Sequence, residues 1–168
     1  MNSKAIDARV KALMKQMTLE EKLGQISQFA NGTVTGPDSG RVGVSELAAK
    51  GGVGSILNFS GAGAINAMQR QAVEKSRLKI PILFGGDIIH GYRTVYPIPL
   101  AMASTWNPTV AEQCARMAAV EASSAGIRWT FSPMVDIARD ARWGRITEGN
   151  GEDPYLGEVM AAAWVRGY

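Results

Sequence analysis

The strongest constraint on the fold is a repeating order of short apolar runs and longer segments with helical spacing. Apolar runs that predict strands lie at residues 53–59, 82–84 and 129–135, and a fourth run, 23–29, is expected to become a strand or to lead into one. They are apolar throughout, which is typical of strands buried on both faces of a parallel sheet. Because a segment with helical periodicity follows each run, the chain has the alternation of strand and helix that defines parallel α/β folds.

Local signals place several helix ends. Thr18 lies three residues before Glu21, a spacing that predicts a capping box at the start of a helix. Asn107 and Asp153 each precede a proline, which predicts an N-cap followed by proline in the first turn. Ser45 is expected to cap a short helix that ends before Gly51, and residues 31–44 are expected to form a loop.

The helix expected over residues 108–125 has one irregular position. Its predicted inner face consists of Val110, Cys114, Met117 and Ala118. Glu121 falls on the same apolar stripe, and a carboxylate buried there needs a partner. We expect that partner to be an arginine or a backbone group.

The length of the chain limits the architecture. A complete (β/α)8 barrel needs about 250 residues, with about 200 as a practical minimum, whereas this chain has 168 residues. We therefore expect an α/β fold in which residues 1–168 form the N-terminal half of a (β/α)8 barrel, with about four strand–helix units. The alternative is a complete small α/β domain with an open sheet.

Composition excludes several classes of protein. Hydrophobic residues make up 46% of the chain, which argues against disorder. The net charge of +3 is scattered without a basic run, so we expect no nucleic-acid partner. We expect no metal site because the chain has one histidine and one cysteine, His90 and Cys114, and we expect no cofactor.

The N-terminus and the apolar runs indicate in which cellular compartment the protein is expected. No stretch is long and apolar enough to predict a membrane span, so we expect no membrane partner. The first residues lack the apolar core of a signal peptide. The sequence therefore predicts a cytoplasmic protein if Met1 is the native start, and a periplasmic or secreted one if a signal peptide was removed.

Candidate binding residues follow the third predicted strand. In barrels, working residues lie at the C-terminal ends of strands, and Gly85-Gly86-Asp87 ends the run 82–84. A carboxylate at Asp87 can accept hydrogen bonds from two vicinal sugar hydroxyls, although it can instead cap a loop or helix. His90, three residues later, is more often a structural histidine than a ligand-binding one.

A second group of candidates follows the fourth predicted strand. Aspartate and arginine alternate from residue 136 to 145, which predicts a rigid, salt-bridged loop with an arginine available to a ligand. Trp143 either stacks on a sugar face or holds the loop in place. Glu148 either binds in the pocket or pairs with a nearby arginine. The acidic segment 148–154 lacks the ligand spacing of a calcium loop, so we expect no metal there.

Several segments together resemble one enzyme family. They are Met17–Gln25, Leu78–Pro81, Asp87–Pro97 and Pro133–Pro154. The run Ala138–Arg145 with the Glu148-Gly149 and Gly151–Pro154 motifs is long and specific. The chain resembles the N-terminal domain of glycoside hydrolase family 3, in the branch of bacterial periplasmic β-glucosidases. It departs at Ala141, where proline is common, and at Asn150, where an aromatic residue is common.

The resemblance implies roles for particular residues. Asp87 and Arg145 are the expected ligands of the terminal sugar, and Glu148, His90 and Trp143 complete the predicted substrate-binding set. The family's Lys-His pair and its nucleophile in a Ser-Asp-Trp-like context are absent from this sequence. We therefore expect no catalytic residue in these 168 residues.

The resemblance also implies an activity for the parent protein. It would be a retaining, exo-acting β-glucosidase that acts on β-glucosides or oligosaccharides. The second half of the barrel and a second α/β domain would carry the nucleophile and the acid/base, so the isolated chain is expected to be inactive. A β-xylosidase or β-glucan exohydrolase is a close alternative, and a non-catalytic sugar-binding or scaffold half-barrel is a more distant one.

Overall fold

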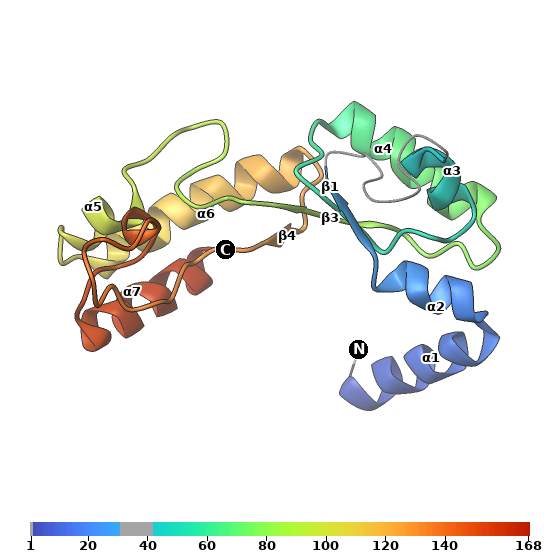
Figure 1. The fold of residues 1–168 in the computed structure, drawn as a ribbon, viewed down its shortest axis with the longest axis horizontal. Helices are drawn as coiled ribbons and strands as arrows, with labels where there is room; N and C mark the ends of the chain where they lie inside the picture. Colours follow the sequence, from blue (N-terminus) through green and yellow to red (C-terminus); the bar gives the residue numbers. More distant parts are fainter. Residues whose placement is uncertain (1, 31–41) are drawn as a thin grey trace. The chain divides into compact units, whose positions relative to one another are not determined.

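The computed structural model describes residues 2–30 and 42–168. The predicted loop 31–44 lies mostly outside these residues. The chain divides into two compact units, Met1–Phe84 and Gly85–Tyr168, here called the first and the second unit (Figure 1).

The strands are parallel and follow one another in chain order. They are β1 (Gln28–Ala30), β2 (Ser55–Leu57), β3 (Leu83–Gly86) and β4 (Trp129–Thr130). The order of hydrogen-bonded neighbours is β1-β2-β3-β4, with Phe29 opposite Ile56 and Gly85 opposite Trp129. Each predicted apolar run contributes a strand, although the runs 53–59 and 129–135 pair over only a few residues. In the run 23–29, residues 23–25 are helical and only residues 28 and 29 lie in β1. The alternation of strands and helices confirms the predicted α/β fold.

Helices separate the strands of the first unit. They are α1 (Ser3–Gln16), α2 (Leu19–Gln25), α3 (Val44–Ala49) and α4 (Ala62–Arg70), which continues into the π-helical segment η1 (Gln71–Lys75). The capping box between Thr18 and Glu21 is confirmed. The predicted cap at Ser45 is wrong, because the N-cap of α3 is Gly43, two residues earlier, and Ser45 lies inside the helix. Val44 is buried in the core, and its burial fixes the start of this helix.

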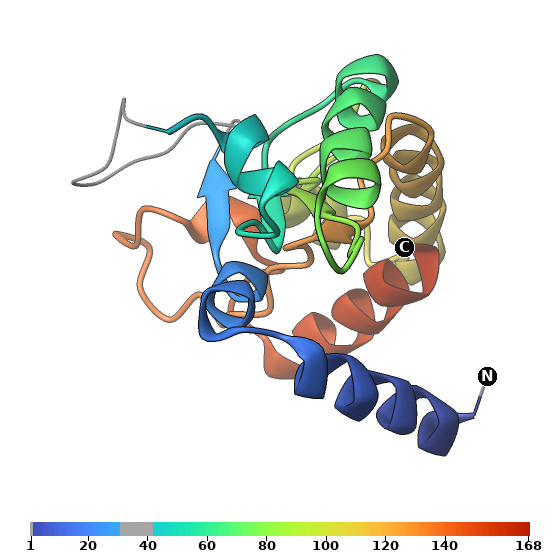
Figure 2. The same cartoon turned by 90° about the vertical axis from the view of Figure 1, so that its right-hand side faces the viewer.

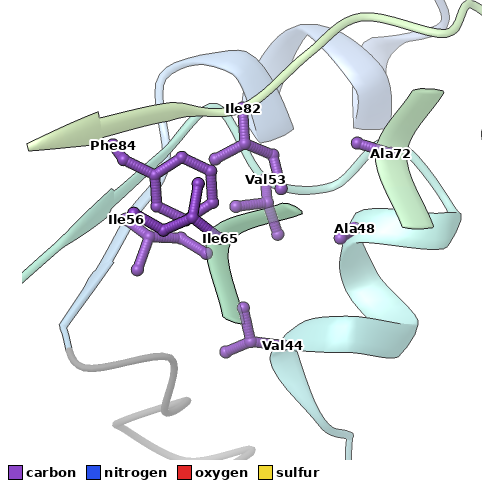
Figure 3. Packing of buried hydrophobic residues seen from close by; sticks show 8 residues of the cluster. All are labelled: Val44, Ala48, Val53, Ile56, Ile65, Ala72, Ile82 and Phe84. Carbon is purple, nitrogen blue, oxygen red and sulfur yellow. The ribbon is translucent and has the colours of Figure 1, made fainter. Parts of the chain in front are cut away.

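An apolar cluster holds the first unit together (Figure 3). Ile56 of β2 and Phe84 of β3 are almost fully buried, and they lie beside Ile65 of α4. Figure 3 shows Ala48 of α3 and Ala72 of η1 on the helical side of this cluster. Apolar burial of this kind is the main favourable term in folding, so this cluster joins the strands to their connecting helices.

Glu21 supplies a polar link in the same unit. Its carboxylate accepts the backbone N–H of Thr18 at 2.9 Å and the Arg77 guanidinium at 2.5 Å and 3.0 Å. Arg77 also donates to the carbonyl of Gln16 at 2.7 Å. The hydrogen bonds from Arg77 and Thr18 lower the pKa of Glu21. The turn between α1 and α2 is thereby tied to the segment that leads into β3.

Helix α1 differs from the other helices of its unit. None of its residues is buried, and Figure 2 shows it standing away from α3 and α4. No helix in the described part of the chain is long and apolar enough to cross a membrane.

The second unit is built on two long helices. Its helical elements are α5 (Pro99–Ala103), α6 (Pro108–Ser124), the 3-10 turn η2 (Ile146–Glu148) and α7 (Pro154–Gly167). Asn107 and Asp153 cap α6 and α7 through their side chains, as the sequence predicts. Helices α6 and α7 pack against each other and can be followed in Figure 2 as the gold and red helices.

Small residues determine how α6 packs. Its buried positions are Ala111, Ala115, Ala118 and Ala122. The predicted inner face was wrong at Met117, which is 50% exposed. A Cβ added to Gly167 of α7 would meet the Glu112 carbonyl and the Ala115 side chain, so the two helices approach too closely for large side chains.

The close approach of α2 and β2 in the first unit gives a testable prediction. A Cβ at Gly54 would overlap the backbone of Gln25, whereas one at Gly63 would meet nothing within 4 Å. We expect Gly54→Ala to lower the free energy of unfolding by roughly 1–3 kcal/mol, the usual cost of overpacking. The matched control Gly63→Ala, in α4, should be neutral or stabilising by up to about 1 kcal/mol. Equal unfolding curves for the two variants would contradict this packing.

Candidate functional site

Asp87 projects from the end of a buried strand in the second unit. Gly85 and Gly86 are buried, and Asp87, the next residue, is exposed. Ile88 is buried again, and its carbonyl accepts a hydrogen bond from the Tyr168 hydroxyl. The backbone on both sides of Asp87 is therefore fixed, while its carboxylate stays accessible.

The predicted site residue His90 begins a tight turn. The backbone N–H of Tyr96 donates to the His90 carbonyl at 2.8 Å, and the His90 ring Nδ1 lies 3.0 Å from the Tyr96 carbonyl. Gly91 and Val95 form an antiparallel bridge inside this turn. The ring is partly buried, and one of its nitrogens takes part in the structure of the turn. Whether the other nitrogen contacts a sugar stays a prediction.

The loop after β4 is held at its base. The Ala138 N–H donates to the Gly151 carbonyl at 3.0 Å, and Ala138 is 6% exposed. Gly149 passes so close to the loop start that an added Cβ would lie 3.3 Å from the Asp136 carbonyl oxygen. Asn150 is buried as well, with no hydrogen-bond partner for its side-chain oxygen among the described residues. Both ends of the loop that carries Arg145 are thus fixed to each other.

Arg145 and Glu148 form a two-pronged ion pair. The Arg145 Nε donates to Glu148 Oε1 at 3.0 Å, and its Nη2 donates to Oε2 at 2.7 Å. Planar guanidinium and carboxylate groups match best in this arrangement. The structure therefore favours one of the two predicted roles of Glu148, the partner of an arginine.

The charge around Arg145 shows which residues lie near it. Its pKa is raised by the hydrogen bond to Glu148 and further by the charges of Glu148, Asp136 and Asp87. The structure thus brings Asp87 into the electrostatic surroundings of Arg145, although the two residues are 58 positions apart in the sequence (145 − 87). The carboxylates of Glu148, Asp136 and Asp87 therefore all act on the Arg145 guanidinium.

The salt bridges predicted for this loop are present, whereas the predicted role of Trp143 is only partly resolved. Arg142 pairs with Asp140 at 2.6 Å, and its side chain is 90% exposed, so this pair confirms a salt-bridged loop. The backbone N–H of Trp143 donates to the Asp140 carbonyl at 3.0 Å, and its carbonyl accepts from Ile146 at 3.2 Å. Trp143 therefore helps to shape the loop through its backbone. Whether its ring stacks on a sugar stays a prediction.

Some residues that organise the site were not predicted from the sequence. The hydroxyl of Tyr168, which follows α7, donates a hydrogen bond to the Ile88 carbonyl. Nothing in the sequence near Tyr168 indicates this contact. Asp136 adds charge near Arg145, whereas the sequence indicates it only as part of a charged loop. A pocket lined by Ile88, Trp129 and Tyr168 lies in the same unit but includes none of the five predicted sugar-binding residues.

The match to a family model identifies the family of this chain. Residues 18–168 match the model of the glycosyl hydrolase family 3 N-terminal domain. The chain therefore belongs to glycoside hydrolase family 3, and its parallel α/β fold is that of the N-terminal barrel domain of this family.

Individual relatives agree with this assignment. A periplasmic β-glucosidase of Salmonella typhimurium is 43% identical over 96% of this chain, and a β-xylosidase of Formosa agariphila is 32% identical over 96%. A β-glucosidase of Listeria innocua in complex with glucose superposes with a TM-score of 0.82 at 37% identity over 96% of the chain. The chain spans 21%, 18% and 23% of these three proteins.

The Arg145–Glu148 pair makes a prediction about titration. The hydrogen bonds from Arg145 lower the pKa of Glu148 below its ordinary value of 4.5. Their contribution to stability is therefore complete above pH 4.5 and is lost as the pH falls through the lowered pKa. We expect Arg145→Leu to raise the pKa of Glu148 towards 4.5 in a carboxyl ¹³C NMR titration.

A crossed control tests whether this effect is specific. Arg142→Leu should leave the titration of Glu148 unchanged and raise the pKa of Asp140, which Arg142 lowers in the same way. If Glu148 titrates identically in the unmodified chain and in Arg145→Leu, the ion pair does not form in solution.

Proposed function

We propose that this chain binds the terminal sugar in a retaining, exo-acting β-glucosidase whose bond-breaking residues lie in another part of the protein. The observation that carries the proposal is the convergence of Asp87 with Arg145 and Glu148 beside the end of β3. The carboxyl ends of parallel strands are the usual location of ligands in this architecture.

The hydrogen-bonding groups of this cluster suit a sugar. The exposed Asp87 carboxylate can accept from two neighbouring hydroxyls, and charged acceptors form the stronger hydrogen bonds. Glu148 uses two of the five N–H donors of Arg145. The remaining donors are available to hydroxyl oxygens. Acceptors and donors at one site can together bind vicinal hydroxyl groups, each of which both donates and accepts.

The titration behaviour of the carboxylates argues against catalysis by this chain alone. A general acid in glycoside hydrolysis needs a raised pKa so that it stays protonated. Among the described residues, each carboxylate with a shifted pKa has it lowered: Glu20, Glu21, Glu121, Asp140 and Glu148. Glu148 in particular stays ionised and is neutralised by Arg145, so it is not suited to protonate a leaving group.

Relatives support the proposed substrate class and the proposal that the catalytic residues lie outside this chain. The chain spans about a fifth of the Salmonella typhimurium β-glucosidase, so most of a comparable protein lies outside it. We place the nucleophile and the acid/base in that remainder, in the second half of the barrel and a further α/β domain. The same relative is periplasmic by name, which favours the periplasmic alternative for the parent protein.

The Formosa agariphila relative supports a second substrate. A β-xylosidase at 32% identity shows that this level of similarity is compatible with a sugar that lacks the terminal hydroxymethyl group. The higher identity to a β-glucosidase, 43%, favours glucose. Assays should therefore compare aryl β-glucosides with aryl β-xylosides.

A chimera tests the proposal directly. The chain would replace the segment that it matches in the Salmonella typhimurium β-glucosidase. We expect the chimera to hydrolyse an aryl β-glucoside and to prefer it to the xyloside, while the isolated chain releases no nitrophenol above the buffer rate. Enzymatic turnover by the isolated chain would contradict the proposal.

The same chimera tests the role of Asp87. Asp87→Asn should lower kcat/KM by about 100-fold or more, because charged hydrogen bonds contribute about 1.5–3 kcal/mol each. The matched control is Asp140→Asn, which removes an exposed carboxylate paired with Arg142 in the same unit and should change kcat/KM less than about threefold. Equal effects of the two substitutions would exclude Asp87 from the sugar site.

A further inference from the structure

Glu121 of α6 binds a loop distant in the sequence. Its Oε2 accepts the backbone N–H groups of Arg93 at 2.8 Å and Thr94 at 2.9 Å, and its Oε1 accepts the Thr94 hydroxyl at 2.6 Å. These three hydrogen bonds lower the pKa of Glu121, with the Thr94 bonds contributing most. Of the two partners expected for this carboxylate, an arginine or a backbone group, the structure shows backbone N–H groups, together with the Thr94 hydroxyl. The expected burial is only partial.

The segment that Glu121 binds is the tip of the turn that begins at His90. Arg93, Thr94 and Val95 are exposed, so apolar burial does not hold the tip in place. Glu121 itself stands between Ala118 and Ala122, which are buried in α6. A carboxylate on a packed helix thus anchors an otherwise solvent-exposed turn.

The base of the turn fixes the His90 ring. Nδ1 lies 3.0 Å from the Tyr96 carbonyl oxygen, which can only accept a hydrogen bond. Nδ1 therefore carries the proton. In the neutral ring Nε2 then has the lone pair and can accept a hydrogen bond. The position of Tyr96 decides which nitrogen is the acceptor.

We infer that Glu121 is a positioning residue that holds the 90–96 turn and thereby sets the tautomer of His90. In this tautomer Nε2 is the acceptor nitrogen of the ring and can accept a hydrogen bond from a sugar hydroxyl. That last step rests on the proposed function. The control of the tautomer by Glu121 does not, and it can be measured without a sugar.

Gly91 explains why the turn needs an anchor at its tip. Its φ is +111°, a conformation that side chains rarely adopt, and an added Cβ would collide with the Thr94 carbonyl. Glycine is also the most flexible residue in an unheld chain. The Glu121 bonds to Arg93 and Thr94 offset this flexibility at the opposite side of the turn.

The test uses the 168-residue chain, in which His90 is the only histidine. Long-range ¹⁵N–¹H NMR of the imidazole gives the tautomer of this ring without an assignment problem. We expect the unmodified chain at a pH where the ring is neutral to show protonated Nδ1 and unprotonated Nε2. In Glu121→Ala the nitrogen shifts should move towards those of a mixture of tautomers.

Hydrogen exchange of the backbone amides measures whether Glu121 holds the turn, and two further variants serve as controls. Glu121→Ala should speed exchange of the Arg93 and Thr94 amides by roughly 10- to 100-fold, the effect of losing hydrogen bonds to a charged group. Glu121→Gln keeps one acceptor oxygen. It should therefore restore part of the protection of the Arg93 and Thr94 amides and part of the His90 population with protonated Nδ1. Glu112→Ala, which removes a carboxylate of the same helix paired with Arg166, should change neither readout.

The outcomes separate positioning from a general structural role. If Glu121→Ala lowers Tm but leaves the His90 nitrogen shifts unchanged, the inference is overturned. If Glu121→Ala does not fold, Thr94→Ala, which removes only the 2.6 Å hydrogen bond, should shift the tautomer in the same direction. If the His90 nitrogen shifts are unchanged in Thr94→Ala, the inference is overturned as well. A sugar-binding failure with the expected tautomers would instead count against the proposed function.

Discussion

The guanidinium of Arg145 balances the charges on which the candidate site depends. Glu148 binds it through two hydrogen bonds, and Asp136 and Asp87 add negative charge nearby. Without Arg145 these carboxylates would lack a nearby opposite charge. The hydrogen bonds from Arg145 lower the pKa of Glu148. Arg145 thus balances charge within the cluster, and its contact with a sugar is part of the proposed function.

Rigid placement of these side chains comes from hydrogen bonds between loops and helices. The Tyr168 hydroxyl holds the carbonyl of Ile88, and the Glu121 carboxylate holds the turn that follows. The Ala138–Gly151 hydrogen bond closes the base of the loop that carries Arg145. Polar loops lack a core of their own, so such bonds give them one geometry. The proposed sugar site would depend on this preorganisation, because ordering a loose loop on binding costs affinity.

Features that adjacent residues determine could be predicted from the sequence, whereas features that depend on contacts between distant residues could not. The caps at Asn107 and Asp153 were predicted because a few adjacent residues determine a cap. The inner face of α6 was partly wrong because close contact with α7 selects alanines and leaves Met117 exposed. Asp87 and Arg145 were predicted as sugar ligands from a strand end and from family motifs, and that prediction is untested. The role of Tyr168 depends on a contact 80 residues away, which no local pattern encodes.

The central claim is that Asp87 and Arg145 bind the same sugar, and a double-mutant cycle on binding tests it most directly. Calorimetry would give the Kd of glucose for the chimera and for its Asp87→Ala, Arg145→Ala and doubly substituted forms. Two residues on one ligand should show a coupling free energy of at least about 0.5 kcal/mol, so that the double substitution differs from the sum of the single ones. Losses that add within about 0.3 kcal/mol would show independent action and contradict the account.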